Sequence, residues 1–259
     1  MITGSGNAQL KKVRELLRSR EARDREGIFA AEGLKIFEEV PDRAVRAIYV
    51  SESFQREHSD LLKDRSFEVV ADSRFGSISD TKNPQGVIAL LEKPGWKMQE
   101  IFRKEAPLLI AAEHLQDPGN AGTILRTAEA AGADAVVFTE DSVDIFNPKV
   151  VRATMGSIFR MPVFYVENAP DFCRTLREHG IRSYAAYLPG STVYDMPDYI
   201  GGTCFWIGNE SKGLTEEAAE AADERIRIPM TEHINSLNAA MAGGILLYEA
   251  ARQRRMNKK

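Results

Sequence analysis

The sequence predicts an α/β protein made of two parts, a small one followed by a larger one with a parallel sheet. In the second part, apolar runs alternate with stretches of helical length, which is typical of βαβ units. The run at residues 108–112 is apolar throughout, as in a strand buried on both faces of a parallel sheet. Residues 92–97 read Glu-Lys-Pro-Gly-Trp-Lys, the composition of a linker. We therefore expect a small domain over residues 1–93, a linker over 94–106 and a larger domain over 107–259.

The first part is expected to alternate short helices and strands. A helix over residues 7–18 is indicated because Leu10, Val13, Leu16 and Leu17 fall on one face. The remaining predicted elements are strands at residues 27–31, 45–50, 67–70 and 87–91, and helices at residues 32–40, 53–62 and a short stretch from Ser73.

The second part is expected to form a parallel sheet with helices between its strands. The predicted strands are residues 108–112, 135–138, 161–166, 183–187, 203–207 and 225–228, and the predicted helices are residues 121–131, 148–159 and 170–179. Asn147 is placed to cap the second of these helices, with Pro148 in its first turn. The last strand stops at Pro229, and Asn235 or Ser236 can cap a long apolar helix that follows.

Composition limits the class of protein. Hydrophobic residues make up 43% of the 259 positions and charged residues 28%, as in an ordinary globular protein. No apolar run is long enough to span a membrane, and the N-terminus lacks the apolar core of a signal peptide. Cys173 and Cys204 lie far apart without a CxxC motif, and no two histidines have metal-ligand spacing. The expectation is a reduced, cytoplasmic protein without a metal or a membrane anchor.

The distribution of charge leaves RNA open as a partner. A formal net charge of −4 argues mildly against nucleic acid, because phosphate binding depends on Lys and Arg. However, residues 11–25 hold seven basic and three acidic side chains, and five basic residues with no acid follow Glu249. The two basic ends could therefore contact RNA, although a basic helix end in solvent has the same composition.

Three polar loops follow predicted strands, at the sheet edge where open α/β proteins bind ligands. In the loop at residues 117–126, Gly119 and Gly122 permit tight turning, and Arg126 lies one helical turn beyond Gly122. The chain has neither a GxGxxG nor a GK[ST] phosphate-binding motif. An alternative interpretation is structural, with Asn120 capping a helix and Arg126 in a surface ion pair.

The second and third loops have the same character. Asn209 and Glu210 stand at the tip of an apolar strand, bracketed by Gly208 and Gly213, and burying such polar groups is costly unless they hold something polar. The loop at residues 229–238 leads into a helix whose first N–H groups lie beside Asn, Ser and Glu side chains. Taken singly, these are also the features of a glycine-rich turn and of an ordinary strand–loop–helix joint.

Taken together, the three loops resemble the signature motifs of the SpoU (TrmH) family of RNA ribose 2′-O-methyltransferases, in the SPOUT superfamily. Residues 120–126 (N-x-G-x-x-x-R) are similar to the first motif and residues 208–214 (G-N-E-x-x-G-L) to the second. Residues 228–238, with Ile-Pro-Met at the start and Ser-Leu-Asn at the end, are similar to the third. The resemblance runs from about residue 108 to the C-terminus. Residues 29–40 also resemble the small L30e-like RNA-binding domain that often precedes this catalytic domain.

The resemblance implies a fold, a cofactor and a partner. The parallel sheet would thread its C-terminal part through a loop into a deep trefoil knot, which strand periodicity does not predict. The knot would bind S-adenosylmethionine and mediate a homodimer. The residues mapped onto the cofactor are Gly208, Asn209, Ile228, Met230 and Leu237, of which the last three offer apolar walls for adenine.

The resemblance also implies a catalytic set of Arg126, Asn120, Glu210, Ser236 and Asn238. A guanidinium has a pKa above about 12 and only donates hydrogen bonds, so Arg126 is a poor general base. We expect Arg126 to hold a phosphate or stabilise the developing alkoxide, while Glu210 orients Arg126 or Asn120. Two departures from the family pattern are Glu232, where glycine is common, and the run Ala-Ala-Met at residues 239–241.

The terminal helix leaves two readings open. Met241, Ile245, Leu246 and Tyr248 suit either a subunit interface or a core, and the glycine pair at residues 243–244 permits a close helix approach. The function predicted is S-adenosylmethionine-dependent 2′-O-methylation of RNA, with ribosomal RNA favoured by analogy because of the appended small domain. The alternatives are a transfer-RNA enzyme of the same family, a knotted base methyltransferase, and a non-catalytic RNA-binding or ribosome-assembly factor.

Overall fold

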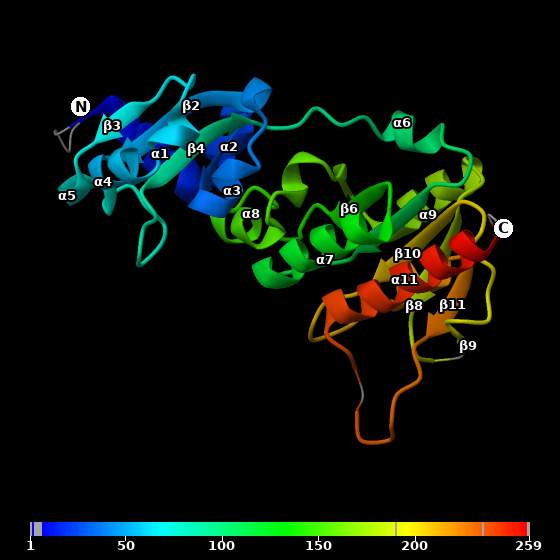
Figure 1. The fold of residues 1–259 in the computed structure, drawn as a ribbon. Coiled ribbons are helices and arrows are strands. Elements are labelled where there is room, and N and C mark those ends of the chain that lie inside the picture. The colour runs from blue at the N-terminus through cyan, green and yellow to red at the C-terminus, as the bar shows by residue number, and fades with distance from the viewer. Residues whose placement is uncertain (1, 3–6, 190, 235, 258–259) are drawn as a thin grey trace. The chain divides into compact units, whose positions relative to one another are not determined.

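The computed structural model describes residues 2, 7–189, 191–234 and 236–257 (Figure 1). Contacts divide the chain into two compact units. The first contains Met1–Gly95 and Asp144–Phe159, and the second contains Trp96–Val143 and Arg160–Lys259. Among the described residues, none of the helices combines the length and the apolar character needed to cross a membrane.

The first unit is a small mixed sheet with helices packed on it. Its strands lie in the order β1-β4-β2-β3, with β4 antiparallel to both neighbours and β2 parallel to β3. The strands are β1 (Ile28–Glu32), β2 (Val45–Ser51), β3 (Glu68–Val70) and β4 (Val87–Glu92). The α-helices before residue 95 are α1 (Ala8–Arg18), α2 (Arg20–Glu26), α3 (Leu34–Glu38), α4 (Glu52–Glu57) and α5 (Asp72–Phe75). The predicted helix at residues 53–62 is wrong in length, because α4 ends at Glu57 and a separate 3₁₀ turn covers Ser59–Leu62.

Helix α2 was not predicted, because it has no apolar stripe. The Ser19 hydroxyl caps it by accepting a hydrogen bond from the Ala22 N–H at 3.1 Å, and Gly27 ends it with φ of +66°. Its Arg23 is only 3% exposed and pairs with Asp144 at 2.6 Å, while also donating to the Leu16 carbonyl at 2.6 Å. A buried charge of this kind is tolerated only with a partner.

Residues 144–159 complete the first unit. Helix α8 (Pro148–Thr154) is capped by Asn147 as predicted, since the Asn147 side chain accepts from the Lys149 N–H at 2.9 Å. The predicted extension of this helix to residue 159 is wrong. The backbone turns left-handed at Met155 (φ +49°) and Gly156 (φ +95°), and a 3₁₀ turn follows at Ser157–Phe159.

The second unit contains a seven-stranded sheet in the order β7-β6-β5-β10-β8-β11-β9, and every neighbouring pair is parallel. The predicted α/β class with a parallel sheet is confirmed. The strands are β5 (Leu108–Ala112), β6 (Ala135–Thr139), β7 (Val163–Val166), β8 (Arg182–Ala186), β9 (Thr192–Val193), β10 (Thr203–Ile207) and β11 (Glu224–Arg227). The helices are α6 (Met98–Phe102), α7 (Pro118–Ala131), α9 (Ala169–Glu178), α10 (Glu216–Ala221) and α11 (Ala239–Asn257).

Helices cover both faces of this sheet. On one face, α9 and α10 pack over a buried cluster that includes Leu109, Ala111 and Trp206. On the other face α11 lies beside α7 (Figure 1). A Cβ atom on Gly243 would come within 2.6 Å of Ile110 Cδ1, and one on Gly244 within 3.3 Å of Thr127 Cγ2. The glycine pair therefore lets α11 approach both the sheet and α7, as predicted.

Three elements of this unit are absent from the sequence prediction. Helix α6 lies within the expected linker, β9 is two residues long, and α10 is a short Glu/Ala helix capped by Thr215. The beginning of α7 also differs, because it starts at Pro118 and is capped by Asp117, whose carboxylate accepts from the Asn120 N–H at 2.7 Å. The alternative reading of Asn120 as a helix cap is therefore wrong. The trefoil knot stays a prediction.

Candidate active site

The three predicted loops converge at one edge of the sheet of the second unit. Strands β5, β10, β8 and β11 are consecutive parallel neighbours, so their carboxyl ends share that edge. The loop before α7 follows β5, the loop at residues 208–214 follows β10, and the segment that leads to α11 follows β11.

The loop after β10 depends on a close backbone approach at Gly208. A Cβ atom there would lie 1.9 Å from the Gly213 carbonyl carbon and 2.0 Å from the Leu214 nitrogen. Asn209 and Gly213 exchange backbone hydrogen bonds of 3.0 and 2.9 Å, and Gly213 has φ of +73°. Only glycine leaves room for this crossing.

The same loop is tied to the end of β5 at two points. Asn209 Nδ2 donates to the His114 carbonyl at 2.8 Å, and Asn209 Oδ1 accepts from the Ser211 and Lys212 N–H groups. At the far end, the Glu113 carboxylate is 4% exposed and accepts from the Thr215 N–H at 2.8 Å and the Thr215 hydroxyl at 2.9 Å. Both ends of the Asn209 amide therefore already have partners, the nitrogen at the end of β5 and the oxygen within the loop.

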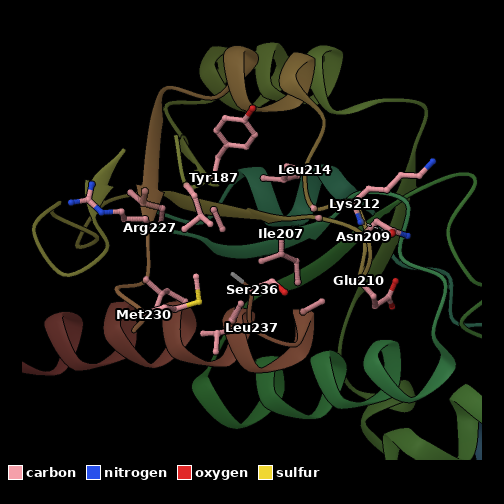
Figure 2. Close-up of a pocket in the computed structure, with 18 of the residues that line it drawn as sticks. Tyr187, Ile207, Asn209, Glu210, Lys212, Leu214, Arg227, Met230, Ser236 and Leu237 are labelled. Carbon is pink, nitrogen blue, oxygen red and sulfur yellow. Dashed lines mark hydrogen bonds between the residues drawn. The ribbon is translucent and has the colours of Figure 1, made fainter. Parts of the chain in front are cut away.

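A cavity of about 380 Å³ lies between this loop, the segment after β11 and the start of α11. Its lining includes all five predicted cofactor residues and also Glu210 and Ser236. In Figure 2, Ile207, Met230 and Leu237 converge on it, whereas the charged ends of Lys212 and Arg227 point away. Residues 186–189, at the end of β8 and directly after it, also line the cavity, and no sequence motif indicated them.

A chain of hydrogen bonds joins three of the predicted catalytic residues at the edge of the cavity. Glu210 Oε1 accepts from Asn120 Nδ2 at 3.1 Å, and Asn238 Nδ2 donates to Asn120 Oδ1 at 2.8 Å. Asn238 Oδ1 then accepts from the Ala240 and Met241 N–H groups at 3.0 and 3.2 Å. Asn238 therefore caps α11, and the predicted cap at Ser236 is wrong because the helix begins three residues later. Asn235 lies outside the described residues.

The hydrogen bonds to Glu210 also set its ionisation. Partial burial favours the neutral acid, but hydrogen bonds from the Asn120 side chain and from the N–H groups of Glu210, Asp117 and Gln116 outweigh it. The pKa of the Glu210 carboxyl is therefore below its ordinary value. Gln116 and Asp117 are part of the site that the motifs did not reveal, because they contribute main-chain groups.

Arg126 and Ser236 stand apart from this chain. Arg126 is exposed on α7, and within the part of the chain that the structure describes no hydrogen bond or ion pair reaches its guanidinium. Of the two partners predicted for Glu210, Arg126 or Asn120, the structure shows a hydrogen bond with Asn120. Ser236 is exposed in the loop before α11, as are Glu232, one of the two departures from the family pattern, and its neighbour His233. Among the described residues, the site therefore combines an apolar cavity, the Glu210 carboxylate fixed by hydrogen bonds, and the exposed Arg126 guanidinium.

Comparisons with known proteins agree with this geometry. Residues 107–248 match the SpoU rRNA Methylase family, and residues 7–89 match the MRM3-like substrate binding domain. The chain is 30% identical over 249 residues to the 23S rRNA (guanosine(2553)-2′-O)-methyltransferase RlmP of Bacillus subtilis, covering 95% of this chain and 97% of that protein. It is 29% identical to the 23S rRNA (uridine(2479)-2′-O)-methyltransferase of Streptomyces viridochromogenes, covering 96% and 91%.

Solved structures of methyltransferases are also similar to this chain. An AdoMet-bound rRNA methyltransferase from Sinorhizobium meliloti superposes with a TM-score of 0.83 at 33% identity, over 97% of each chain. The SpoU methyltransferase AviRb from Streptomyces viridochromogenes, in complex with AdoMet, superposes with a TM-score of 0.85 at 28% identity, over 96% of this chain and 98% of that one.

Proposed function

Because this chain belongs to the SpoU rRNA methylase family, we propose that it transfers the methyl group of S-adenosylmethionine to a ribose 2′-hydroxyl of ribosomal RNA. The observation that carries the proposal is the hydrogen-bonded chain from Glu210 through Asn120 to Asn238, at the edge of an apolar cavity. The family supplies the reaction class, and the relatives that act on 23S rRNA support ribosomal over transfer RNA.

The cavity fits S-adenosylmethionine in size and character. Its volume of about 380 Å³ is within the range of small-molecule sites. Ile207, Ile228 and Leu237 supply apolar walls for adenine, and Gly208 brings main-chain groups to the cavity without a side chain. When bound, the sulfonium supplies an activated methyl group, and the protein has to position the ribose against it.

The roles of the catalytic residues follow from their contacts. Asn120 Nδ2 donates to the ionised Glu210 carboxylate, and Asn120 Oδ1 accepts from Asn238 Nδ2. The two contacts together fix the orientation of the Asn120 amide. The lowered pKa makes Glu210 a weak base, so its role is orientation. Arg126 keeps its donors free for a phosphate or for the developing alkoxide, and Ser236 contributes a hydroxyl at the cavity.

The role of Arg126 can be tested by replacing its guanidinium with the ammonium group of a lysine. Arg126→Lys keeps the charge but loses the planar fork of donors, so single-turnover methyl transfer should fall even when RNA is saturating. A near-normal rate would remove Arg126 from the catalytic set.

The small domain at residues 1–93 is proposed to bind RNA, in line with the substrate-binding family that it matches. The domain at residues 107–259 would carry the chemistry, and residues 94–106 would connect the two. A cytoplasmic location belongs to the same proposal.

We also infer that the protein acts as a homodimer through α11. Met241, Tyr248 and Met256 recur at intervals of seven and eight residues, and they are 61%, 48% and 64% exposed. This spacing puts them along one helix face, whose apolar exposure supports a subunit interface.

Mass spectrometry of ribonucleosides tests the function. Total RNA from cells with and without the gene should differ by one 2′-O-methylated nucleotide, found in the large ribosomal RNA. A loss from transfer RNA would favour the transfer-RNA enzyme, and a loss of a base methylation would favour the base methyltransferase. No loss, with no heat of S-adenosylmethionine binding in calorimetry, would favour the non-catalytic RNA-binding factor.

A further inference from the structure

His114 has a backbone conformation that its residue type rarely adopts. It follows β5 directly and has φ of +54°, in the left-handed region where a Cβ atom is unfavourable. A glycine would take this conformation without strain. Strained residues persist where the surrounding structure fixes them, and they concentrate at functional sites.

The surroundings of His114 fix its backbone firmly. Its N–H donates to Thr139 Oγ1 at 2.9 Å, and its carbonyl accepts from Asn209 Nδ2 at 2.8 Å and Gln116 Nε2 at 3.3 Å. These contacts involve the end of β6, the loop after β10 and the loop before α7. The backbone conformation therefore follows from the same loops that form the candidate site.

One nitrogen of the imidazole ring has a hydrogen bond, and the other lies near a second carboxylate. Nδ1 is hydrogen-bonded to Asp141, and Nε2 lies 3.8 Å from a Glu113 carboxylate oxygen. The side chain is nevertheless 44% exposed. The ring is therefore fixed at Nδ1 and remains partly accessible to solvent.

The backbone of His114 adjoins the candidate site through its carbonyl contact with Asn209, and the residue does not line the cofactor cavity. Glu210 accepts hydrogen bonds from the N–H groups of Gln116 and Asp117, two and three residues after His114. His114 is absent from the cavity lining, so S-adenosylmethionine has no contact to gain from it. A ribose placed at the Glu210–Asn120–Asn238 chain carries its own base, and that base must lie outside the same cavity.

We propose that His114 is a substrate-recognition residue, whose ring stacks on the unpaired base of the nucleotide that is methylated. Sequence-specific RNA recognition commonly stacks splayed-out bases on aromatic side chains, histidine among them. The ring is a preorganised platform, because its hydrogen bond to Asp141 restricts its orientation before RNA arrives. This inference rests on the proposed RNA methylation.

Two substitutions separate this role from a structural one. His114→Gly removes the ring and relieves the left-handed strain, and His114→Asn removes the ring with a residue that tolerates this conformation. Both variants should still melt in one cooperative transition and keep the affinity for S-adenosylmethionine measured by calorimetry. With in-vitro-transcribed large-subunit rRNA, kcat/KM for RNA should fall about tenfold, as expected for the loss of one stacked base.

A modified substrate tests the stacking itself. A short RNA stem, with the methylated nucleotide replaced by an abasic ribose, retains the 2′-hydroxyl but has no base. The full-length protein should methylate it about tenfold less well than the intact stem, whereas His114→Gly should treat the two stems alike.

Three results would overturn the proposal. The first is an unchanged kcat/KM in both variants, and the second is an equal abasic penalty with and without the ring. The third is a parallel loss of S-adenosylmethionine affinity, which would make His114 a structural residue. If the unaltered protein bound S-adenosylmethionine but methylated no RNA, the proposed function would fail, and this inference with it.

Discussion

Glu210 illustrates how hydrogen bonds select the role of a carboxylate. Its two oxygens accept from Gln116, Asp117 and Asn120, which favours the ionised form against partial burial. A neutral acid accepts such hydrogen bonds more weakly than an ionised carboxylate, so these bonds favour the charged form. The residue is therefore suited to hold Asn120 and unsuited to take a proton.

Glu210→Gln should lower methyl transfer by about a hundredfold, which is typical when a reacting group loses its fixed position. The new amide keeps one acceptor oxygen, and its NH₂ group cannot accept from the N–H of Gln116 or Asp117. Single-turnover kinetics with saturating RNA measure the effect. The control is Glu217→Gln on the exposed side of α10, which should retain the normal rate.

The lowered pKa of Glu210 predicts a pH dependence of stability. A carboxyl whose pKa in the folded state is below its ordinary 4.5 stabilises the fold above that pH, and the contribution is lost as the pH falls through the folded value. The melting temperature of the unaltered protein should exceed that of Glu210→Gln by a constant amount near neutral pH. The gap should narrow as the pH falls below 4.5, and a gap that did not narrow in acid would contradict the assignment.

Gly208→Ala should abolish measurable S-adenosylmethionine binding. The added Cβ atom would lie 1.9 Å from the Gly213 carbonyl carbon, so the loop after β10 would have to move. Overpacking of this kind costs about 1–3 kcal/mol of stability. Isothermal titration calorimetry and thermal melts measure both effects. Gly201→Ala is the matched control, because its Cβ atom meets nothing within 4 Å.

At the scale of elements, helix α11 connects the cofactor cavity to the catalytic chain. Asn238 uses one side-chain oxygen to cap the helix and one nitrogen to hold Asn120. Gly243 lets the same helix approach β5, from which the loop before α7 departs. The position of the helix and the orientation of Asn120 are therefore coupled.

Substitutions at Asn238 can separate capping from orientation. Asn238→Ala removes both contacts and should cost about 1 kcal/mol of stability together with most of the activity. Asn238→Asp is as good a cap, but it has no N–H to donate to Asn120, so it should retain stability and lose activity. Urea denaturation and methyl-transfer assays measure the two quantities. If Asn238→Asp were fully active, the contact to Asn120 would be dispensable.

The elements differ in how well their sequences predict them. Strand β5 is an unbroken apolar run and was predicted at its true position, whereas α7 begins at Pro118, three residues before the predicted start, and contains both Gly119 and Gly122. Helix α2 has no apolar stripe, and β9 is too short for any periodicity. Within the site, the motifs identified Asn120, Glu210 and Asn238. They could not reveal the left-handed backbone of His114, because a histidine in a sequence does not by itself indicate a positive φ.

At the scale of the whole molecule, the exposed face of α11 predicts self-association. Met241→Glu with Tyr248→Glu would put two charges on an apolar surface and should convert a dimer into a monomer. Sedimentation velocity measures the mass. Glu217→Gln again serves as the control, and a protein that is monomeric before substitution would rule out the proposed interface.

The contact between Arg23 and Asp144 has a consequence for dissecting the protein. The first unit draws Asp144–Phe159 from the middle of the chain, and Phe29 packs against Phe146 with ring centroids 4.8 Å apart. A fragment that stops at residue 95 would lack Asp144, leaving Arg23 buried without its partner at a cost of about 3–5 kcal/mol. The unit that is contiguous in space is thus discontinuous in sequence. A functional small fragment would need these sixteen residues supplied as a second peptide or grafted through a loop.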